Sequence, residues 1–305
     1  MGFDKIISQE KVVKLLKGTL KTKKIPNAFL FIGDSYIGKT QTAIAYAKAL
    51  NCPDKNLDFC DECSSCKKIN SGLHPDVKVI TPEKDVITVG NIREVEEFVS
   101  FHPLEARYKV IIIKEAHKMN QSAANAFLKT IEEPPLNTTI ILICENIHAL
   151  PEPLISRCFK IYFAPLSINS MKEIIPDSPQ KDLLIKLAMG RPRLFTSRNM
   201  LKDIQDFADT LKNKNRKLTW KDNEEIKWWI DFLCIFLRDA ISNKFTSNYC
   251  QILPINFKLK ENVTVHEILN LYEELQEVRK NIDLNLNKSI LWNYTEKLIG
   301  RVINV

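Results

Sequence analysis

The sequence predicts an α/β fold with a doubly wound parallel sheet, followed by an all-helical C-terminal part. Short apolar runs alternate with amphipathic helical segments up to residue 165, as expected for strands that are buried on both faces of a sheet. Beyond that point such runs nearly vanish, and long segments with helical periodicity follow. The chain therefore divides into a mixed N-terminal part and a helical C-terminal part.

Length and charge set wide limits on function. A chain of 305 residues with 45% hydrophobic content has room for roughly two or three domains with full cores. There is no long apolar window, and Met1 is not followed by a hydrophobic signal region. We therefore expect a cytoplasmic protein without a membrane partner. A net charge of +7 permits a polyanionic partner but does not require one.

The strongest motif lies in residues 28–40 (AFLFIGDSYIGKT), where an apolar run meets the phosphate-loop pattern G-x-x-x-x-G-K-[ST]. The loop consists of Gly33, Asp34, Ser35, Tyr36, Ile37, Gly38, Lys39 and Thr40. Residues 41–50 follow as a predicted helix, which gives the strand, loop and helix order that the motif needs. Backbone N–H groups, the Lys39 ammonium and the Thr40 hydroxyl can then bind phosphate and Mg²⁺. The sequence predicts a nucleotide phosphate site here.

Four cysteines form the second motif, spaced C-x7-C-x2-C-x2-C within residues 52–66: Cys52, Cys60, Cys63 and Cys66. Four thiolates match a closed structural zinc site, which has no open position for catalysis. Redox disulfides and an iron–sulfur cluster are the alternatives. The paired C-x2-C turns favour zinc. Three other cysteines, Cys158, Cys234 and Cys250, are interpreted as buried thiols.

Further strands are expected at residues 76–80, 108–113, 139–144 and 159–163, and helices at residues 8–20, 89–101 and 120–133. Ser8 is expected to cap the first of these helices. Lysines crowd the polar side of that helix and the loop after it, either as a solvated face or as a nucleic-acid patch: Lys14, Lys17, Lys21, Lys23 and Lys24. In the C-terminal part we expect helices at residues 226–241, 265–279 and 290–302.

The strand at residues 108–113 ends in Lys114-Glu115. Many phosphate-loop ATPases carry an Asp for Mg²⁺ and a Glu that orients water at this place. Lys114 removes a metal ligand and adds a like charge, and one unit-charge pair at roughly 4 Å is worth about 4 kcal/mol at an effective dielectric near 20. Hydrolysis should therefore be poor, even though Glu115 occupies the water-activating position. His117 is expected to pack or cap rather than to catalyse.

The order of motifs in residues 27–158 resembles the bacterial clamp-loader AAA+ family of DNA polymerase III, most nearly its delta-prime branch. The phosphate loop, the cysteine insertion, KEAHKMN, ANAFLKTIEEPP and Ser156-Arg157-Cys158 carry the resemblance. It implies an AAA+ domain in residues 1–165, a small helical lid in 166–200 and a helical collar in 201–305. The stretch with Asn281, Asn285 and Asn287 resembles the end of that collar.

The resemblance also implies how the site works. Family members either hydrolyse ATP or, in the delta-prime branch, generally do not, and Lys114 places this chain with the second group. We expect ATP or ADP to bind, Mg²⁺ to be held weakly, and Arg193 to touch the nucleotide as the lid arginine. Hydrolysing members place a small hydroxyl residue where this chain has Cys144, a weaker hydrogen-bond donor.

For Arg157, the resemblance implies an active role in a neighbouring subunit, in contrast to the poor hydrolysis expected at the chain's own site. From residue type alone it is a structural arginine at the start of a strand. In the family, the arginine of Ser-Arg-Cys projects into a neighbouring subunit's nucleotide site as an arginine finger. The implied partners are gamma/tau-type clamp-loader ATPase subunits, a delta subunit, a sliding clamp and, through the complex, primed DNA.

Three functions are therefore weighed. The first is a delta-prime-like accessory subunit of the polymerase III holoenzyme that donates Arg157 and has no independent ATPase activity. The second is a hydrolysing gamma/tau-type ATPase in which another carboxylate compensates for Lys114. The third is a zinc-stabilised nucleic-acid-binding protein with a vestigial phosphate loop, which the basic helix face would support.

Overall fold

The computed structural model describes residues 2–83, 85–179, 181–192, 200–212, 223–245, 253, 259–260, 262–282 and 287–302. As far as they are described, the residues form two compact units, Met1–Pro176 with Met189–Arg193 and Asp177–Ala188 with Leu194–Val305. Within the expected lid, helix α7 (Ile168–Ile174) belongs to the first unit and α8 (Lys181–Ala188) to the second. The division into three domains stays a prediction.

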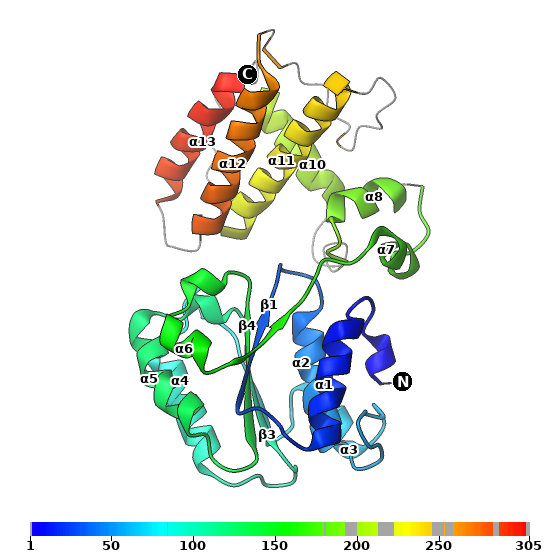
Figure 1. Ribbon diagram of the computed structural model, residues 1–305, viewed down its shortest axis with the longest axis vertical. Helices are drawn as coiled ribbons and strands as arrows, with labels where there is room; N and C mark the ends of the chain where they lie inside the picture. The colour runs from blue at the N-terminus through cyan, green and yellow to red at the C-terminus, as the bar shows by residue number, and fades with distance from the viewer. Residues whose placement is uncertain are drawn as a thin grey trace. The chain divides into compact units, whose positions relative to one another are not determined.

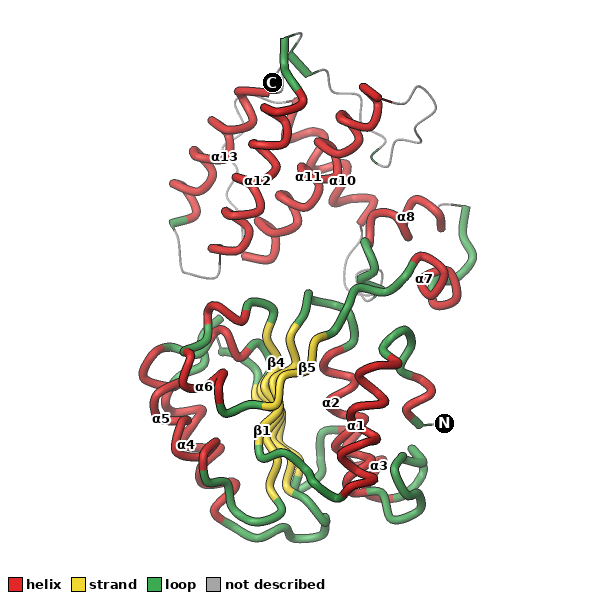
Figure 2. Tube along the Cα trace, in the orientation of Figure 1, coloured by secondary structure: helices red, strands yellow, loops and turns green. Residues whose placement is uncertain are grey.

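A five-stranded parallel sheet forms the centre of the first unit (Figures 1 and 2). Its strands are β1 (Ala28–Ile32), β2 (Val77–Ile80), β3 (Lys109–Ile113), β4 (Thr138–Cys144) and β5 (Phe159–Tyr162). They lie in the order β2-β3-β4-β1-β5, and each neighbouring pair is parallel. The predicted doubly wound α/β class is therefore confirmed, and all predicted strands form.

Helices cover both faces of this sheet (Figure 1). One face carries α1 (Glu10–Thr22), α2 (Lys39–Asn51) and α3 (Ser64–Ser71), and the other carries α4 (Val89–Ser100), α5 (Gln121–Glu132) and α6 (Glu152–Ser156). Successive side chains of β1 point to opposite faces. Leu30 belongs to the core cluster with α4, α5 and α6, whereas Phe29 packs on Tyr46 of α2 with ring centroids 5.2 Å apart. Both faces of β1 are buried, which explains its continuous apolar run.

The predicted capping role of Ser8 is wrong. Helix α1 begins at Glu10, and its N-cap residue, Gln9, makes no side-chain capping bond. Ser8 has a φ of 57°, and its hydroxyl hydrogen-bonds the hydroxyl of Ser170 in α7. The Ser8 side chain therefore bonds to a residue that is distant in sequence instead of capping the helix.

The second unit is helical in its described part. It contains α8, α10 (Met200–Lys212), α11 (Asn223–Phe245), α12 (Val265–Asn281) and α13 (Lys288–Val302). The aromatic stripe of α11 forms core: the Trp229 ring lies 5.4 Å from Phe207 of α10 and 5.2 Å from Trp292 of α13. Asp231 and Arg279 join α11 to α12 at 2.7 Å. None of the described helices combines the length and apolarity that crossing a membrane requires.

A buried carboxylate fixes the loop that leads into β3. Asp76 is 0% exposed and accepts backbone N–H bonds from Leu104, Glu105 and Ala106 at 2.8, 2.9 and 2.9 Å. Burial opposes ionisation of Asp76, but the three N–H donors outweigh it and hold its pKa below the ordinary value. The ionised side chain therefore stabilises the native loop.

We expect Asp76→Asn to lower the free energy of unfolding at pH 7 by about 3 kcal/mol, because the amide replaces a charged acceptor of several N–H groups. A depressed native pKa contributes stability above the ordinary aspartate pKa of about 4, and this contribution is lost as the pH falls through the native value. Urea unfolding of both proteins between pH 7 and pH 3 should show the difference shrinking with acidity. A constant difference across this range would contradict the assignment.

Candidate functional site

The predicted phosphate loop lies between β1 and α2, as the motif requires. Gly33 has a φ of 151°, and a Cβ there would lie 2.7 Å from the backbone oxygen of Phe163. Gly38, with a φ of 96°, forms the N-cap of α2. Both positions therefore need glycine, the first for close approach and the second for its left-handed conformation. The loop N–H groups and the start of α2 form a site suited to an anion.

Lys39 is the first residue of α2 and is 6% exposed. Its ammonium folds back into the loop and donates to the backbone oxygens of Gly33 and of Asp34, the latter at 2.5 Å. Burial lowers the pKa of Lys39, and the carboxylates of Glu145, Asp34 and Glu115 oppose that shift. The buried ammonium thus lies where phosphate oxygens would replace the loop carbonyls as acceptors.

The sheet order brings the ends of three strands together at this site. β4 lies between β3 and β1, and the Gly33 N–H donates to the oxygen of Cys144, the last residue of β4, at 3.3 Å. Glu145 therefore begins its turn beside the phosphate loop. The sequence interpretation gave Glu145 no role. The sequence held a signal for a role of Glu145. A carboxylate that directly follows a strand parallel to β1 and next to it must lie at the edge of the sheet where the phosphate loop lies.

Cys144 and His117 are buried beside the ends of β4 and β3, respectively. Burial raises the pKa of the Cys144 thiol to about 12, so the side chain stays a neutral, weak donor. His117 is 5% exposed, and its Nδ1 accepts from the Glu145 N–H at 3.5 Å. His117 thus packs between the turns after β3 and β4, in agreement with its predicted structural role.

The residues after β3 are arranged around an ion pair. The Lys114 N–H donates to Ile80 of β2 at 3.0 Å, which continues the sheet ladder by one residue. Glu115 adopts a left-handed φ of 48°, and its carboxylate lies 2.5 Å from the Lys118 ammonium, which also contacts Asp85 at 2.8 Å. Burial lowers the pKa of Lys118, but its bonds to Asp85 and Glu115 outweigh burial and raise it. Glu115 therefore faces a permanent cation.

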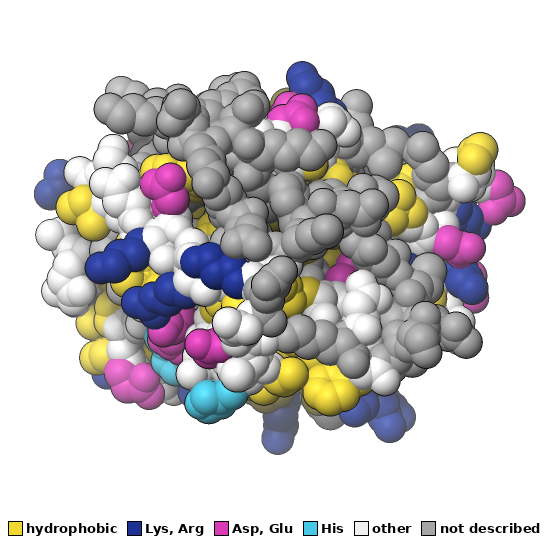
Figure 3. Space-filling model, turned by 90° about the horizontal axis from the view of Figure 1, so that it is seen from above, with side chains coloured by type: hydrophobic (Ala, Val, Ile, Leu, Met, Phe, Trp, Pro, Cys, Tyr) yellow, Lys and Arg dark blue, Asp and Glu magenta, His cyan; other side chains and the backbone are white. Residues whose placement is uncertain are grey.

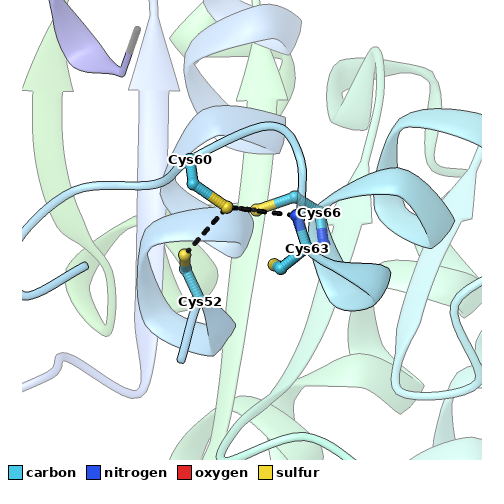
Figure 4. A group of neighbouring side chains, drawn as sticks. All are labelled: Cys52, Cys60, Cys63 and Cys66. Carbon is cyan, nitrogen blue, oxygen red and sulfur yellow. Dashed lines mark hydrogen bonds between the residues drawn. The ribbon is translucent and has the colours of Figure 1, made fainter. Parts of the chain in front are cut away.

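The four cysteines come together, as predicted (Figure 4). Their sulfur atoms all lie within 4.8 Å of one another. The Cys52 and Cys60 sulfurs are 3.6 Å apart, and the Cys60 and Cys66 sulfurs 4.0 Å. Tetrahedral zinc with Zn–S bonds of about 2.3 Å holds its sulfurs about 3.8 Å apart. The sulfur geometry therefore fits a four-coordinate zinc ion.

Backbone N–H groups favour the thiolate form at one of the four cysteines, Cys60, whereas burial raises the pKa of Cys63 and of Cys66. The Cys63 N–H donates to the Cys60 sulfur at 3.2 Å and the Glu62 N–H does so at 3.4 Å. The Cys63 N–H contributes most to a lowered pKa of Cys60, which favours the thiolate that metals bind. Cys63 caps α3, and Cys66 lies within it. The C-x2-C spacing is thus built on a helix start.

The segment 52–66 that carries these cysteines, here called the cysteine module, also anchors the N-terminus. The Phe3 N–H donates to Asp58 Oδ1 at 2.9 Å, and the Phe3 ring packs edge-on against Phe59 at 5.6 Å. Lys5 pairs with Asp61 at 2.9 Å. Phe3 is 1% exposed as a result. The module therefore has a structural role in the first unit.

Part of the basic helix face serves the same module. The Lys17 ammonium lies 3.8 Å from Asp58 and 5.5 Å from the centroid of the Phe3 ring. The other lysines of this face are exposed: Lys14, Lys21, Lys23 and Lys24. On the face seen from above, basic and acidic side chains lie near one another among the described residues (Figure 3). Lys17 thus helps to pack α1 against the cysteine module.

Arg157 lies immediately after α6, as the C-cap residue of that helix. Its side chain is 38% exposed. Its Nε donates to Glu132 at 2.5 Å, and its Nη1 donates to the carbonyl oxygen of Pro153 at 2.7 Å. The guanidinium is thus ordered at the surface by its own chain. The sequence interpretation did not identify Glu132 as its partner.

Two predicted residues lie outside the described part of the chain, namely the expected lid arginine, Arg193, and the thiol of Cys250. Asn285 of the expected collar segment does so too. Cys158 and Cys234 are buried, and burial raises the pKa of each thiol to about 12. Their predicted interpretation as buried thiols is confirmed.

A phosphate loop on a parallel sheet of order β2-β3-β4-β1-β5, with a helical C-terminal part, defines an α/β protein of the AAA+ class. Comparison with known families gives the more specific assignment. Residues 8–167 match the family model described as "DNA polymerase III, delta subunit". The chain therefore belongs to this family of DNA polymerase III clamp-loader subunits.

Individual relatives include two kinds of clamp-loader subunit. The chain is 40% identical over 170 residues to DNA polymerase III subunit tau of Bacillus subtilis, which covers 55% of this chain and 30% of the relative. It is 34% identical over 165 residues to subunit delta' of the same organism, covering 54% and 50%. It is 29% identical over 306 residues to subunit delta' of Buchnera aphidicola, covering 88% and 91%. The chain spans half or less of the two Bacillus relatives.

Proposed function

We propose that this chain is a delta-prime-like clamp-loader subunit, which binds nucleotide with little or no hydrolysis and donates Arg157 to a neighbouring ATPase subunit. The end of β3 carries the proposal. Lys114 stands at the expected metal-ligand position and Glu115 is paired with Lys118, whereas the phosphate loop and Lys39 are complete. Nucleotide binding is therefore retained, while Mg²⁺ coordination and water activation are both impaired.

The proposal assigns the remaining features as follows. Zinc occupies the four cysteines, and ATP or ADP occupies the phosphate loop with Arg193 of the lid beside it. The partners are gamma/tau-type ATPase subunits and a delta subunit, and the complex places a sliding clamp on primed DNA in the cytoplasm. The all-helical C-terminal part acts as the collar through which the subunits assemble.

A hydrolysing gamma/tau-type ATPase is the second candidate, and the identity of 40% to a tau subunit favours it. This alternative needs a carboxylate that compensates for Lys114. We infer Glu145 for that role, since it directly follows Cys144, whose backbone oxygen accepts the Gly33 N–H of the phosphate loop at 3.3 Å.

The test is nucleotide binding and hydrolysis by the isolated chain. We expect ADP to bind in calorimetry, and Lys39→Ala to weaken binding by roughly 10- to 100-fold, the scale of a charge-assisted bond to phosphate. Lys24→Ala, which changes an exposed lysine of the basic face, is the matched control. ATP turnover should stay at background in all three proteins. Turnover that Lys39→Ala abolishes would favour the gamma/tau-type candidate instead.

A further inference from the structure

All three guanidinium nitrogens of Arg157 contact acceptors within the chain. Nε donates to Glu132 Oε1 at 2.5 Å, and Nη2 contacts the same carboxylate oxygen. Nη1 donates to the Pro153 carbonyl oxygen at 2.7 Å. The two short contacts, with acceptors on different helices, thus define both the position and the plane of the guanidinium.

Both acceptors belong to anchored parts of the fold. Glu132 is the last residue of α5 and follows Ile131, which is 2% exposed. Pro153 lies in the first turn of α6 and precedes Leu154, which is 0% exposed. Ile131 and Leu154 share one core cluster. The orientation of Arg157 therefore derives from the packed core of the first unit.

These contacts leave a side of the guanidinium for another molecule. Each Nη atom carries two N–H bonds. The short contacts with Glu132 and Pro153 use one on each, and among the described residues Nη1 makes in addition only a long contact of 3.5 Å with the Ser156 hydroxyl. The Arg157 side chain is 38% exposed. The remaining N–H bonds form a fork of the kind that suits phosphate oxygens. The arrangement is thus ready to receive an anion presented by a second molecule.

We propose that Glu132 is the positioning residue of Arg157, holding its guanidinium in the orientation that reaches the phosphates of a nucleotide bound by a neighbouring subunit. This inference rests on the proposed function. A free arginine side chain would have to be ordered at each encounter, at a cost in rotamer entropy, and a small misplacement of a catalytic group slows a reaction strongly. Glu132 itself does not touch the nucleotide.

The chain provides a matched control in the next residue. Glu133 carries the same carboxylate one position further along, and its backbone N–H donates to Lys129 at 3.2 Å. In the described part of the chain its side chain makes no contact with Arg157. Glu132→Gln and Glu133→Gln therefore remove the same charge from the same surface, but only the first turns the charged acceptor of Arg157 into a neutral amide oxygen, which binds a guanidinium more weakly.

The first readout is the Arg157 Nε–H signal in NMR spectra of the isolated full chain. We expect slow solvent exchange of this proton in the unmodified protein and in Glu133→Gln, and faster exchange in Glu132→Gln, where the acceptor is neutral. The second readout is pre-steady-state ATP hydrolysis by a complex reconstituted with tau-type ATPase subunits. Glu132→Gln should slow hydrolysis at the adjoining site about fivefold, the scale of an exposed ion pair with good geometry, and Glu133→Gln less than about twofold.

The double variant Glu132→Gln/Arg157→Ala separates positioning from a general structural effect. If Glu132 acts through Arg157, the double variant should hydrolyse ATP at the same rate as Arg157→Ala alone. A further loss in the double variant, or faster hydrolysis in Glu132→Gln, would overturn the proposal, since the second result would mean that Glu132 withholds the guanidinium. If Arg157→Ala does not slow ATP hydrolysis, the proposed function fails. If Arg157→Ala slows hydrolysis and Glu132→Gln does not, only the positioning role of Glu132 fails.

Discussion

Replacing Arg157 by alanine is expected to slow ATP hydrolysis at the adjoining site of the neighbouring ATPase subunit by about 10³-fold, the lower end of what a trans arginine contributes. The reason is loss of a guanidinium that is exposed and held by Glu132 and Pro153, so that charge developing on the γ-phosphate meets no cation. Because the proposal places Arg157 at a single adjoining site, the effect should appear as a fall in the amplitude of the pre-steady-state burst by the contribution of one site.

Arg93→Ala is the control for this measurement, because Arg93 is an exposed arginine on α4. The burst should be unchanged with Arg93→Ala. Equal bursts for the unmodified chain and Arg157→Ala would show that Arg157 is a surface arginine whose contacts are structural. Gel filtration of each mixture checks that the complex still assembles.

Removing the proposed zinc ion is expected to have the largest effect on stability. A structural zinc site contributes its binding energy to folding, and here the cysteine module also holds Phe3 and Lys5 through Asp58, Phe59 and Asp61. Chelation should lower the free energy of unfolding of the first unit by at least ~3 kcal/mol. It should also make the N-terminal segment sensitive to limited proteolysis.

Elemental analysis of the purified chain before and after chelation supplies the control. The melting temperature should fall as zinc is lost and should recover when zinc is added back. A chain that contains no metal, or whose melting temperature ignores its loss, would contradict the zinc assignment and would leave the cysteines as a cluster of thiols.

The sheet could be predicted because parallel central strands are apolar on both faces, which leaves an unmistakable run such as KVIII in β3. The cysteine cluster could be predicted because its ligands are local in sequence. Helix α10 was not predicted, although its buried Ile204, Phe207 and Ala208 have helical spacing. The apolar residues of this 13-residue helix recur with a clear helical period, so the signal was available and was missed.

The hydrogen-bond partners of Arg157 and Ser8 could not be predicted from the sequence. Arg157 and Glu132 are 25 residues apart in sequence, and only the packing of α6 beside α5 brings them together. Ser8 was misassigned for the same reason, because its partner Ser170 is 162 residues away. Local patterns specify elements, whereas a tertiary partner decides which acceptor a polar side chain finds.

The central claim is that this chain serves a neighbour's nucleotide rather than its own, and two variants in one assay test it most directly. ATP hydrolysis would be measured in the reconstituted complex with Lys39→Ala, which disables the chain's own site, and with Arg157→Ala, which leaves that site intact. The account predicts that Lys39→Ala keeps the full burst and that Arg157→Ala loses one site. The reverse pattern, with the burst lost in Lys39→Ala and kept in Arg157→Ala, would contradict it.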